Sequence, residues 1–65
     1  MEWLEMPDGW KILEMGKDNK SCYVYIPELN SCYGALIRMH GGELYFSMFD
    51  RCIWYRIPKE VYNDG

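Results

Sequence analysis

The clearest pattern of hydrophobic and polar positions lies between Cys32 and Ile57, where it predicts three antiparallel strands. The predicted strands cover residues 32–39, 43–49 and 52–57. Gly41-Gly42 forms the first turn, because glycine readily adopts the positive φ that two-residue hairpin turns require. This three-stranded unit organises the rest of the chain.

The two turns of this unit predict the same core face independently. Centring the first hairpin on its glycines pairs Ile37 with Phe46, and centring the second on Asp50-Arg51 pairs Phe46 with Tyr55. A four-residue loop in place of the second turn leaves this pairing unchanged. Alternate side chains point to opposite faces of a strand, so one face is entirely apolar. It carries Ala35, Ile37, Met39, Leu44, Phe46, Met48, Ile53, Tyr55 and Ile57. A one-residue slip in either hairpin would break this agreement.

The opposite face of the predicted sheet is aromatic and contains two arginines. It carries Leu36, Arg38, Tyr45, Ser47, Phe49, Trp54 and Arg56. A solvated sheet face usually alternates to small polar and charged residues, whereas Tyr, Trp, Phe and Arg are enriched at protein interfaces. Two interpretations follow. Either the N-terminal segment or a second copy of the chain covers this face as a second core, or the face is exposed and binds a partner.

Residues 22–26 form a further strand, because aromatic and β-branched residues dominate their composition. If Cys22, Val24 and Ile26 face the core, Tyr23 and Tyr25 join the aromatic face. The opposite orientation stays open, because the loop at residues 27–31 does not determine the register.

The remaining segments give weaker signals. Residues 2–6 are compatible with a strand or with one turn of helix, and residues 10–15 are predicted to form a strand after a proline- and glycine-containing turn. Proline is favoured at the first helical position, so residues 58–62 are predicted to form one helical turn. Val61 and Tyr62 of this turn are expected to pack against one end of the sheet, before a frayed end at residues 63–65.

Length and composition limit the architecture and the partners. We expect residues 1–65 to form one domain of marginal stability, with large side chains to compensate: three Trp, six Tyr and two Phe. The formal net charge is −3, and the ten acidic residues are scattered along the chain. A dense array of like charge, as in a mimic of nucleic acid, is therefore not expected.

The three cysteines and the apolar segments bear on localisation. An odd number of cysteines without CxxC spacing is typical of a reducing compartment, so we expect a cytoplasmic protein. Cys22 and Cys32 begin adjacent antiparallel strands and thus lie at opposite ends, which argues against a disulfide between them. Cys52, near a turn, is the best candidate for a reactive thiol. The start of the chain does not resemble a secretory signal, and no segment is long enough to span a membrane.

Catalytic and metal sites are not predicted. His40 is the only histidine and no cysteine lies near it in sequence, whereas zinc needs four ligands, or three and a water molecule. Cys52 is predicted at the other end of the sheet from His40, which argues against a nucleophilic pair. We therefore expect a protein that is not an enzyme and binds no cofactor or metal.

These observations predict an all-β domain: an antiparallel meander of about five strands, curled into an SH3-like barrel or a strongly twisted half-barrel, with a C-terminal helical turn. The predicted function is non-catalytic protein binding, by analogy with phage-encoded inhibitors or regulators of host macromolecular machines. The predicted partner-binding residues are Arg38, Tyr45, Phe49, Trp54, Arg56, Tyr23 and Tyr25. A homodimer would also bury such a face. The alternative function is binding of single-stranded nucleic acid on the surface aromatics, which the acidic composition disfavours.

Overall fold

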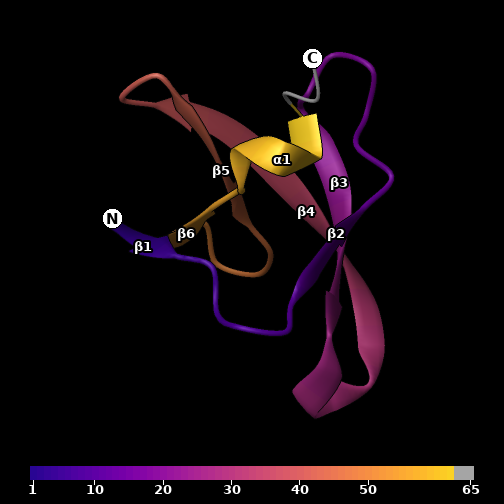
Figure 1. Ribbon diagram of the computed structural model, residues 1–65. Helices are drawn as coiled ribbons and strands as arrows, with labels where there is room; N and C mark the ends of the chain where they lie inside the picture. Colours follow the sequence, from indigo (N-terminus) through magenta and orange to yellow (C-terminus); the bar gives the residue numbers. More distant parts are fainter. Residues whose placement is uncertain (63–65) are drawn as a thin grey trace.

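The computed structural model describes residues 1–62, which form a six-stranded mixed sheet followed by a short helix (Figure 1). The strands are β1 (Glu2–Glu5), β2 (Lys11–Leu13), β3 (Ser21–Ile26), β4 (Ser31–His40), β5 (Glu43–Ser47) and β6 (Ile53–Arg56). A 3-10 turn, η1 (Pro27–Leu29), connects β3 to β4, and helix α1 (Lys59–Tyr62) follows β6. The fold is therefore mostly β, as the sequence predicts. The frayed end expected at residues 63–65 lies outside the described residues.

Strands β2 to β6 form the predicted antiparallel meander of five strands. In its centre, Ile37 pairs with Phe46 and Phe46 pairs with Tyr55, which confirms the register that the two turns predict. Both glycines of the first turn have positive φ. Cys22 pairs with Ala35, so β3 turns Cys22, Val24 and Ile26 to the core and its tyrosines to the opposite face. Local turn chemistry therefore determines the centre of the fold.

The sixth strand, β1, comes from residues 2–6, for which the sequence allows either a strand or one turn of helix. β1 pairs in parallel with β6, and Trp3 lies opposite Trp54. This pair makes the sheet mixed, where the sequence predicts an antiparallel one. A parallel neighbour cannot be joined by a tight turn, so no local signal in the sequence indicates this pairing.

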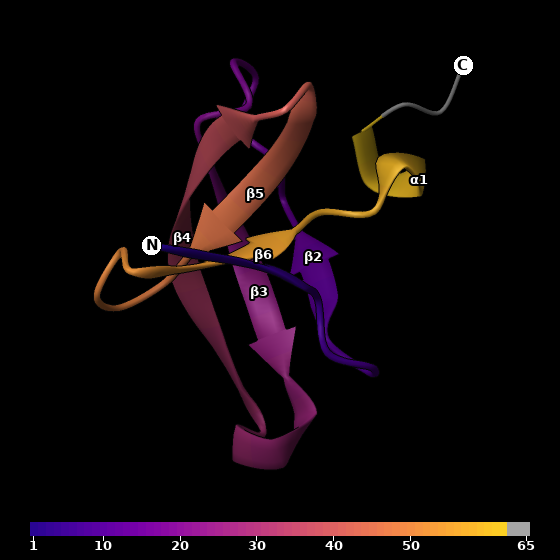
Figure 2. The same cartoon turned by 90° about the vertical axis from the view of Figure 1, so that its left-hand side faces the viewer.

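The sheet does not close into a barrel. In the strand order β1-β6-β5-β4-β3-β2, strands β1 and β2 form the two edges. Figure 2 shows β1 and β6 crossing β3 and β4 at a steep angle, so the sheet is strongly twisted. Between the two edge strands runs the connection at residues 6–10, from which Met6 and Trp10 pack against the core. The space between β1 and β2 is therefore covered by side chains and not by a hydrogen-bonded ladder. Pro7 lies in this connection and has no N–H to contribute to a ladder.

The core lies on the predicted apolar face of the sheet. Its buried members are Cys22, Val24, Ile26, Ala35, Leu44, Phe46 and Ile57. Met39 is an exception, because 67% of it is exposed although it pairs with the buried Leu44. Ile57 donates its backbone N–H to the carbonyl of Leu44 at 2.8 Å, so the chain after β6 continues alongside β5 next to Leu44. Met39 lies on β4, on the side of Leu44 away from Ile57 and near the tip of the hairpin.

Helix α1 is the predicted single turn after Pro58. The backbone N–H of Val61 donates to the carbonyl of Pro58 at 3.0 Å. Tyr62 packs against the core, as expected, whereas Val61 is exposed.

Candidate functional site

The predicted binding face has two halves, and β1 covers the half around Trp54. Only 3% of Trp54 is exposed, and its ring centroid lies 5.8 Å from that of Trp3. The guanidinium carbon of Arg38 lies 5.1 Å from the centroid of the Trp54 ring, within the range of a cation–π contact. The indole Nε1 of Trp54 donates to the carbonyl of Arg51 at 3.0 Å. Around Trp54, the N-terminal segment therefore covers the aromatic face, which is the first of the two interpretations of the sequence.

Arg56 is bound by carboxylates of the chain itself. Its Nε and one terminal nitrogen each donate to Glu5 at 2.8 Å, and its other terminal nitrogen lies 3.6 Å from Glu43. The hydrogen bonds with Arg56 lower the pKa of Glu5, and the same contacts raise the pKa of Arg56 further above its usual value. The planar guanidinium suits such a two-bond contact with a carboxylate. Arg56 therefore acts here as a cross-link between β1, β6 and β5.

Tyr45 belongs to the same cluster, together with Trp3 and His40, which the sequence did not place on the predicted binding face. The ring of Trp3 stacks on His40, with centroids 3.8 Å apart and planes within 2°. Tyr45 contacts Trp3 edge-on, with centroids 5.1 Å apart. In a strand at residues 2–5, Trp3 and Glu5 would lie on the same side, and this is the only sign in the sequence of their shared role. The alternation does not indicate which strand β1 joins.

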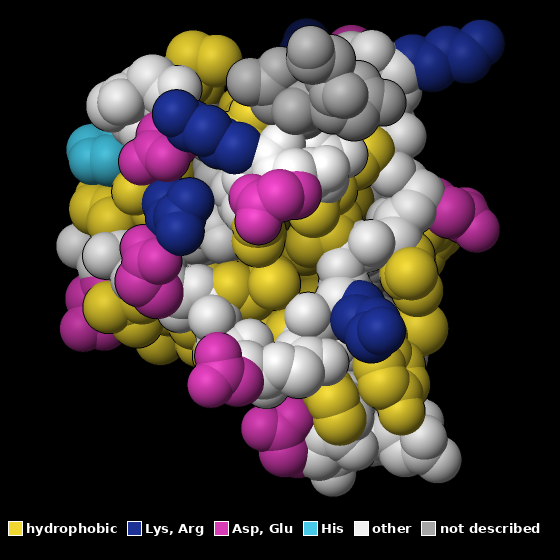
Figure 3. Space-filling view, in the orientation of Figure 1, with side chains coloured by type: hydrophobic (Ala, Val, Ile, Leu, Met, Phe, Trp, Pro, Cys, Tyr) yellow, Lys and Arg dark blue, Asp and Glu magenta, His cyan; other side chains and the backbone are white. Residues whose placement is uncertain are grey.

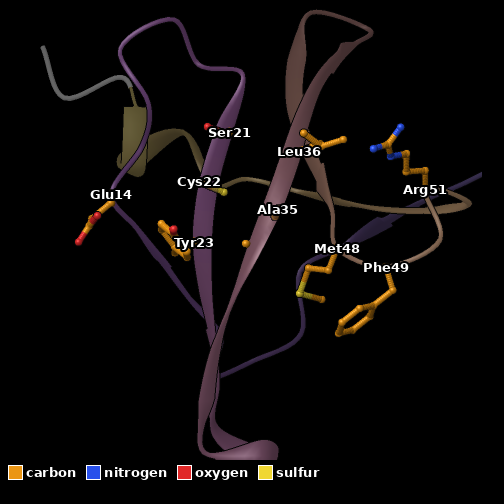
Figure 4. Close-up of a pocket in the computed structure, with 10 residues that line it drawn as sticks. Glu14, Ser21, Cys22, Tyr23, Ala35, Leu36, Met48, Phe49 and Arg51 are labelled. Carbon is orange, nitrogen blue, oxygen red and sulfur yellow. The ribbon is translucent and has the colours of Figure 1, made fainter.

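The other half of this face is an open groove. Three exposed, large apolar side chains line it, each from a different element: Tyr23 of β3 (51% exposed), Leu36 of β4 (41%) and Phe49 of the loop after β5 (72%). The groove has a volume of about 360 Å³. Figure 4 shows Tyr23 on one side, Phe49 and Arg51 on the other, and Ala35 and Leu36 of β4 between them. Of the seven predicted residues, Tyr23 and Phe49 thus lie together in a groove that is open to solvent.

Gly34 lines this groove in the middle of β4. A Cβ atom on Gly34 would meet only the Tyr23 ring, at 3.8 Å, which is an ordinary contact distance. The absence of a side chain at this position therefore leaves space above the strand. Tyr25, two residues along β3, is instead half-buried and donates its hydroxyl to Asn30 Oδ1 at 3.0 Å, which links β3 to the end of η1.

A second pocket of about 370 Å³ lies on the core side of the sheet. Its apolar lining comes from Trp10, Ile26, Leu29, Phe49, Ile53 and Tyr55. Glu28 and Asp50 provide its charged groups, and no Lys or Arg is among its lining residues. Phe49 and its neighbour Met48 line both this pocket and the groove. In the space-filling view of one face, apolar side chains lie between scattered single charges, as the sequence predicts (Figure 3).

Metal-binding and nucleophilic side chains are the groups that could support chemistry. Among residues 1–62, no cluster of three or more His, Cys, Asp and Glu side chains is arranged to hold a metal ion. Burial raises the pKa of the Cys22 thiol to about 11, which leaves it protonated and unreactive at neutral pH. Cys32 and Cys52 are free and exposed. No helix in this part of the chain has the length and apolar character to cross a bilayer.

Comparisons with protein-family models, with curated proteins and with solved structures found no match for this chain. The residues of the groove and the pocket are therefore the basis on which a function can be proposed.

Proposed function

We propose that this domain is a non-catalytic protein-binding module whose docking surface is the groove between Tyr23, Leu36 and Phe49. The observation that carries the proposal is the convergence of three exposed, large apolar side chains from three elements on one groove. Exposed apolar clusters with a polar rim are typical of protein interaction sites. A small domain with such a groove could act by occupying the surface of a larger molecule, so we propose the role of an inhibitor or regulator.

The proposal moves the binding surface away from Trp54 and Arg56. Both side chains are engaged within the chain, Trp54 beneath its neighbours and Arg56 with two carboxylates. The same facts weaken the alternative of a nucleic-acid platform, because stacking on bases requires exposed rings and phosphates require free cations.

A pair of matched variants tests this function. Phe49→Ser removes a 72% exposed side chain from the groove, and Met39→Ser removes a 67% exposed one from the far end of β4. Cross-linking of the tagged protein expressed in cells of its source, followed by purification and mass spectrometry, should recover one partner with wild type and Met39→Ser. Recovery of that partner with Phe49→Ser should fall at least tenfold, because truncation of a hot-spot aromatic at the centre of an interface costs about 2 kcal/mol or more. Equal recovery with all three proteins would rule out the groove as the docking surface.

Gly34→Val provides a second test from the floor of the groove. The new Cβ fits beside the Tyr23 ring, and valine is favoured in strands, so the variant should fold. Because its side chain occupies the groove, the partner should be lost while the circular dichroism spectrum is retained. A folded Gly34→Val protein that still binds its partner would contradict the proposal.

A further inference from the structure

Strand β4 has a stretch of unpaired edge next to the end of β5. Its residues 31–36 pair with β3 on one side, and its residues 36–40 pair with β5 on the other. The β5 ladder ends where Leu36 pairs with Ser47. Within the described chain, residues 31–35 of β4 therefore have a strand neighbour only on the β3 side.

The backbone groups on this edge follow from the alternation of a strand. The N–H of Ile37 donates to the carbonyl of Lys20 at 2.9 Å, so Ile37 directs its backbone groups towards the β3 side. Successive residues direct their N–H and C=O groups to opposite sides of an antiparallel strand. Cys32 and Gly34 therefore direct theirs towards the unpaired edge. Unpaired groups of this kind form a template for an added strand.

The groove and the apolar pocket both lie near this edge: residues 34–36 of β4 line the groove, and Ile26, which pairs with Ser31 at the start of β4, lines the pocket. Tyr23 and Leu36 border the groove on one face, and Ile26 and Tyr55 border the pocket on the other. Phe49 lines both hollows. A strand placed beside residues 31–35 would direct alternate side chains to the two faces, and therefore into the groove and into the pocket.

The charges around the pocket indicate which side chains suit it. Glu28 and Asp50 line it, with no basic residue among its lining groups. The Trp10 indole donates to Glu28 at 3.3 Å and the Cys52 N–H donates to Asp50 at 3.0 Å, so both carboxylates are held in place. An apolar side chain with a Lys or Arg beside it on the same face would match this lining. A second copy of this chain, with net charge −3, matches it less well.

We propose that an extended basic and apolar peptide segment of the partner adds as a strand to the free edge of β4. Backbone hydrogen bonds to Cys32 and Gly34 hold the segment, an apolar side chain fills the pocket next to Tyr55, and a neighbouring Lys or Arg meets Glu28 and Asp50. This mode of recognition takes affinity from the main chain and specificity from the pockets. It rests on the proposed protein-binding function, for which it names the class of ligand.

The test uses an array of capped heptapeptides with Thr at the four odd positions and every combination of Lys, Arg, Leu, Phe, Asp and Glu at the three even positions. Even positions share one face of a strand. The strongest binders should combine Leu or Phe with Lys or Arg. In the complex with ¹⁵N-labelled protein, the amide hydrogens of Cys32 and Gly34 should exchange at least tenfold more slowly than in the free protein.

Backbone methylation of the best peptide separates strand addition from side-chain docking. N-methylation of alternate residues removes either the N–H groups that face β4 or those that face away from it. One of these two peptides should lose at least tenfold in affinity, because several hydrogen bonds are lost together, and the other should bind like the parent. An equal effect of both would overturn the proposal.

Charge variants of the protein complete the test. Glu28→Gln and Asp50→Asn keep the oxygen acceptors and remove the charges, so each should weaken the best basic peptide by about two- to fivefold. Glu60→Gln on α1 is the control and should leave the affinity unchanged.

Preferred binding of acidic peptides or of single-stranded oligonucleotides would contradict the proposal. So would a result in which no peptide slows the hydrogen exchange of the Cys32 and Gly34 amides. If the two amides of the free protein instead exchange more slowly as the protein concentration rises, a second copy of the chain occupies the edge. If strand addition fails while partner recovery still depends on Phe49, the protein-binding function stands without it.

Discussion

At the scale of single residues, the two arginines of the predicted binding face have different surroundings. Arg56 is held between the carboxylates of Glu5 and Glu43, whereas Arg38 lies over the Trp54 ring. The same residue type that is enriched at interfaces is used here to join strands. Residue type alone therefore does not identify a binding side chain, because its neighbours determine whether it is free to meet a partner.

The contact between Arg56 and Glu5 predicts a pH dependence. Because the pKa of Glu5 is lower in the folded protein, its contribution to stability is present above roughly pH 4.3, the usual value for Glu. This contribution is lost as the pH falls through the lowered value. Wild type should therefore lose more thermal stability between pH 5 and pH 3 than Glu5→Gln, which has no such group to protonate. Melting curves followed by circular dichroism across this range provide the measurement.

Glu2→Gln is the matched control for this experiment. Glu2 lies on the same strand, three residues from Glu5, and points to the opposite face of the sheet. Its melting temperature should follow the wild-type pH profile. If Glu5→Gln also follows that profile, the contact with Arg56 contributes nothing measurable to stability, as is found for many exposed ion pairs.

At the scale of elements, β1 changes the character of the sheet. It has four residues, yet it brings Trp3 beside Trp54 and Glu5 beside Arg56 through one parallel register. A side-chain cluster on the face opposite the main core results, and it includes His40 from the tip of the β4–β5 hairpin. The N-terminal strand thus joins parts of the fold that are distant in the sequence.

Removal of the Trp3 ring should expose this cluster. We expect Trp3→Ala to lower the free energy of unfolding by about 2–3 kcal/mol, because a partly buried aromatic ring and its stacking on His40 are lost. Leu4→Ala on the same strand removes an exposed side chain and should cost less than about 1 kcal/mol. Urea denaturation measures both values, and quenching of Trp fluorescence by acrylamide reports whether Trp54 becomes accessible. A Trp3→Ala protein as stable as Leu4→Ala would show that β1 does not hold the cluster.

At the scale of the whole molecule, the sheet is open and leaves two hollows on either side of one strand edge. Phe49, in the loop that leads from β5 to β6, lines both of them. The loop is therefore the structural feature that links the docking groove to the proposed site of strand addition.

The oligomeric state follows from how much apolar surface remains exposed. Because Trp3 of β1 packs against Trp54, which is only 3% exposed, the half of the face around Trp54 is not free to pair with a second copy of the chain. We therefore expect light scattering on a sizing column to give the mass of one chain, 7.8 kDa. A mass of twice this value, reduced to that of one chain by Phe49→Ser, would mean that the groove is a dimer interface.

The structure of the meander could be predicted from the sequence because its information is local. Two short turns set the pairing of β4, β5 and β6, and a single misplaced residue would have reversed every side chain. The candidate site could be predicted only in part. Tyr23 lies on the face opposite the core, whereas Phe49 follows the end of β5 and lines hollows on both faces. Nothing in the sequence separates the open half of the aromatic face from the covered half.

The sequence by itself determined the strand class, the register of the three central strands and the apolar face, since each depends on alternation and on turns between neighbouring residues. Only the tertiary structure decided the position of β1, the burial of Trp54, the pairing of Arg56 and the unpaired edge of β4. These features depend on contacts between residues up to 51 positions apart, with no turn to report them. The surface left open for a partner is what remains after those contacts have formed.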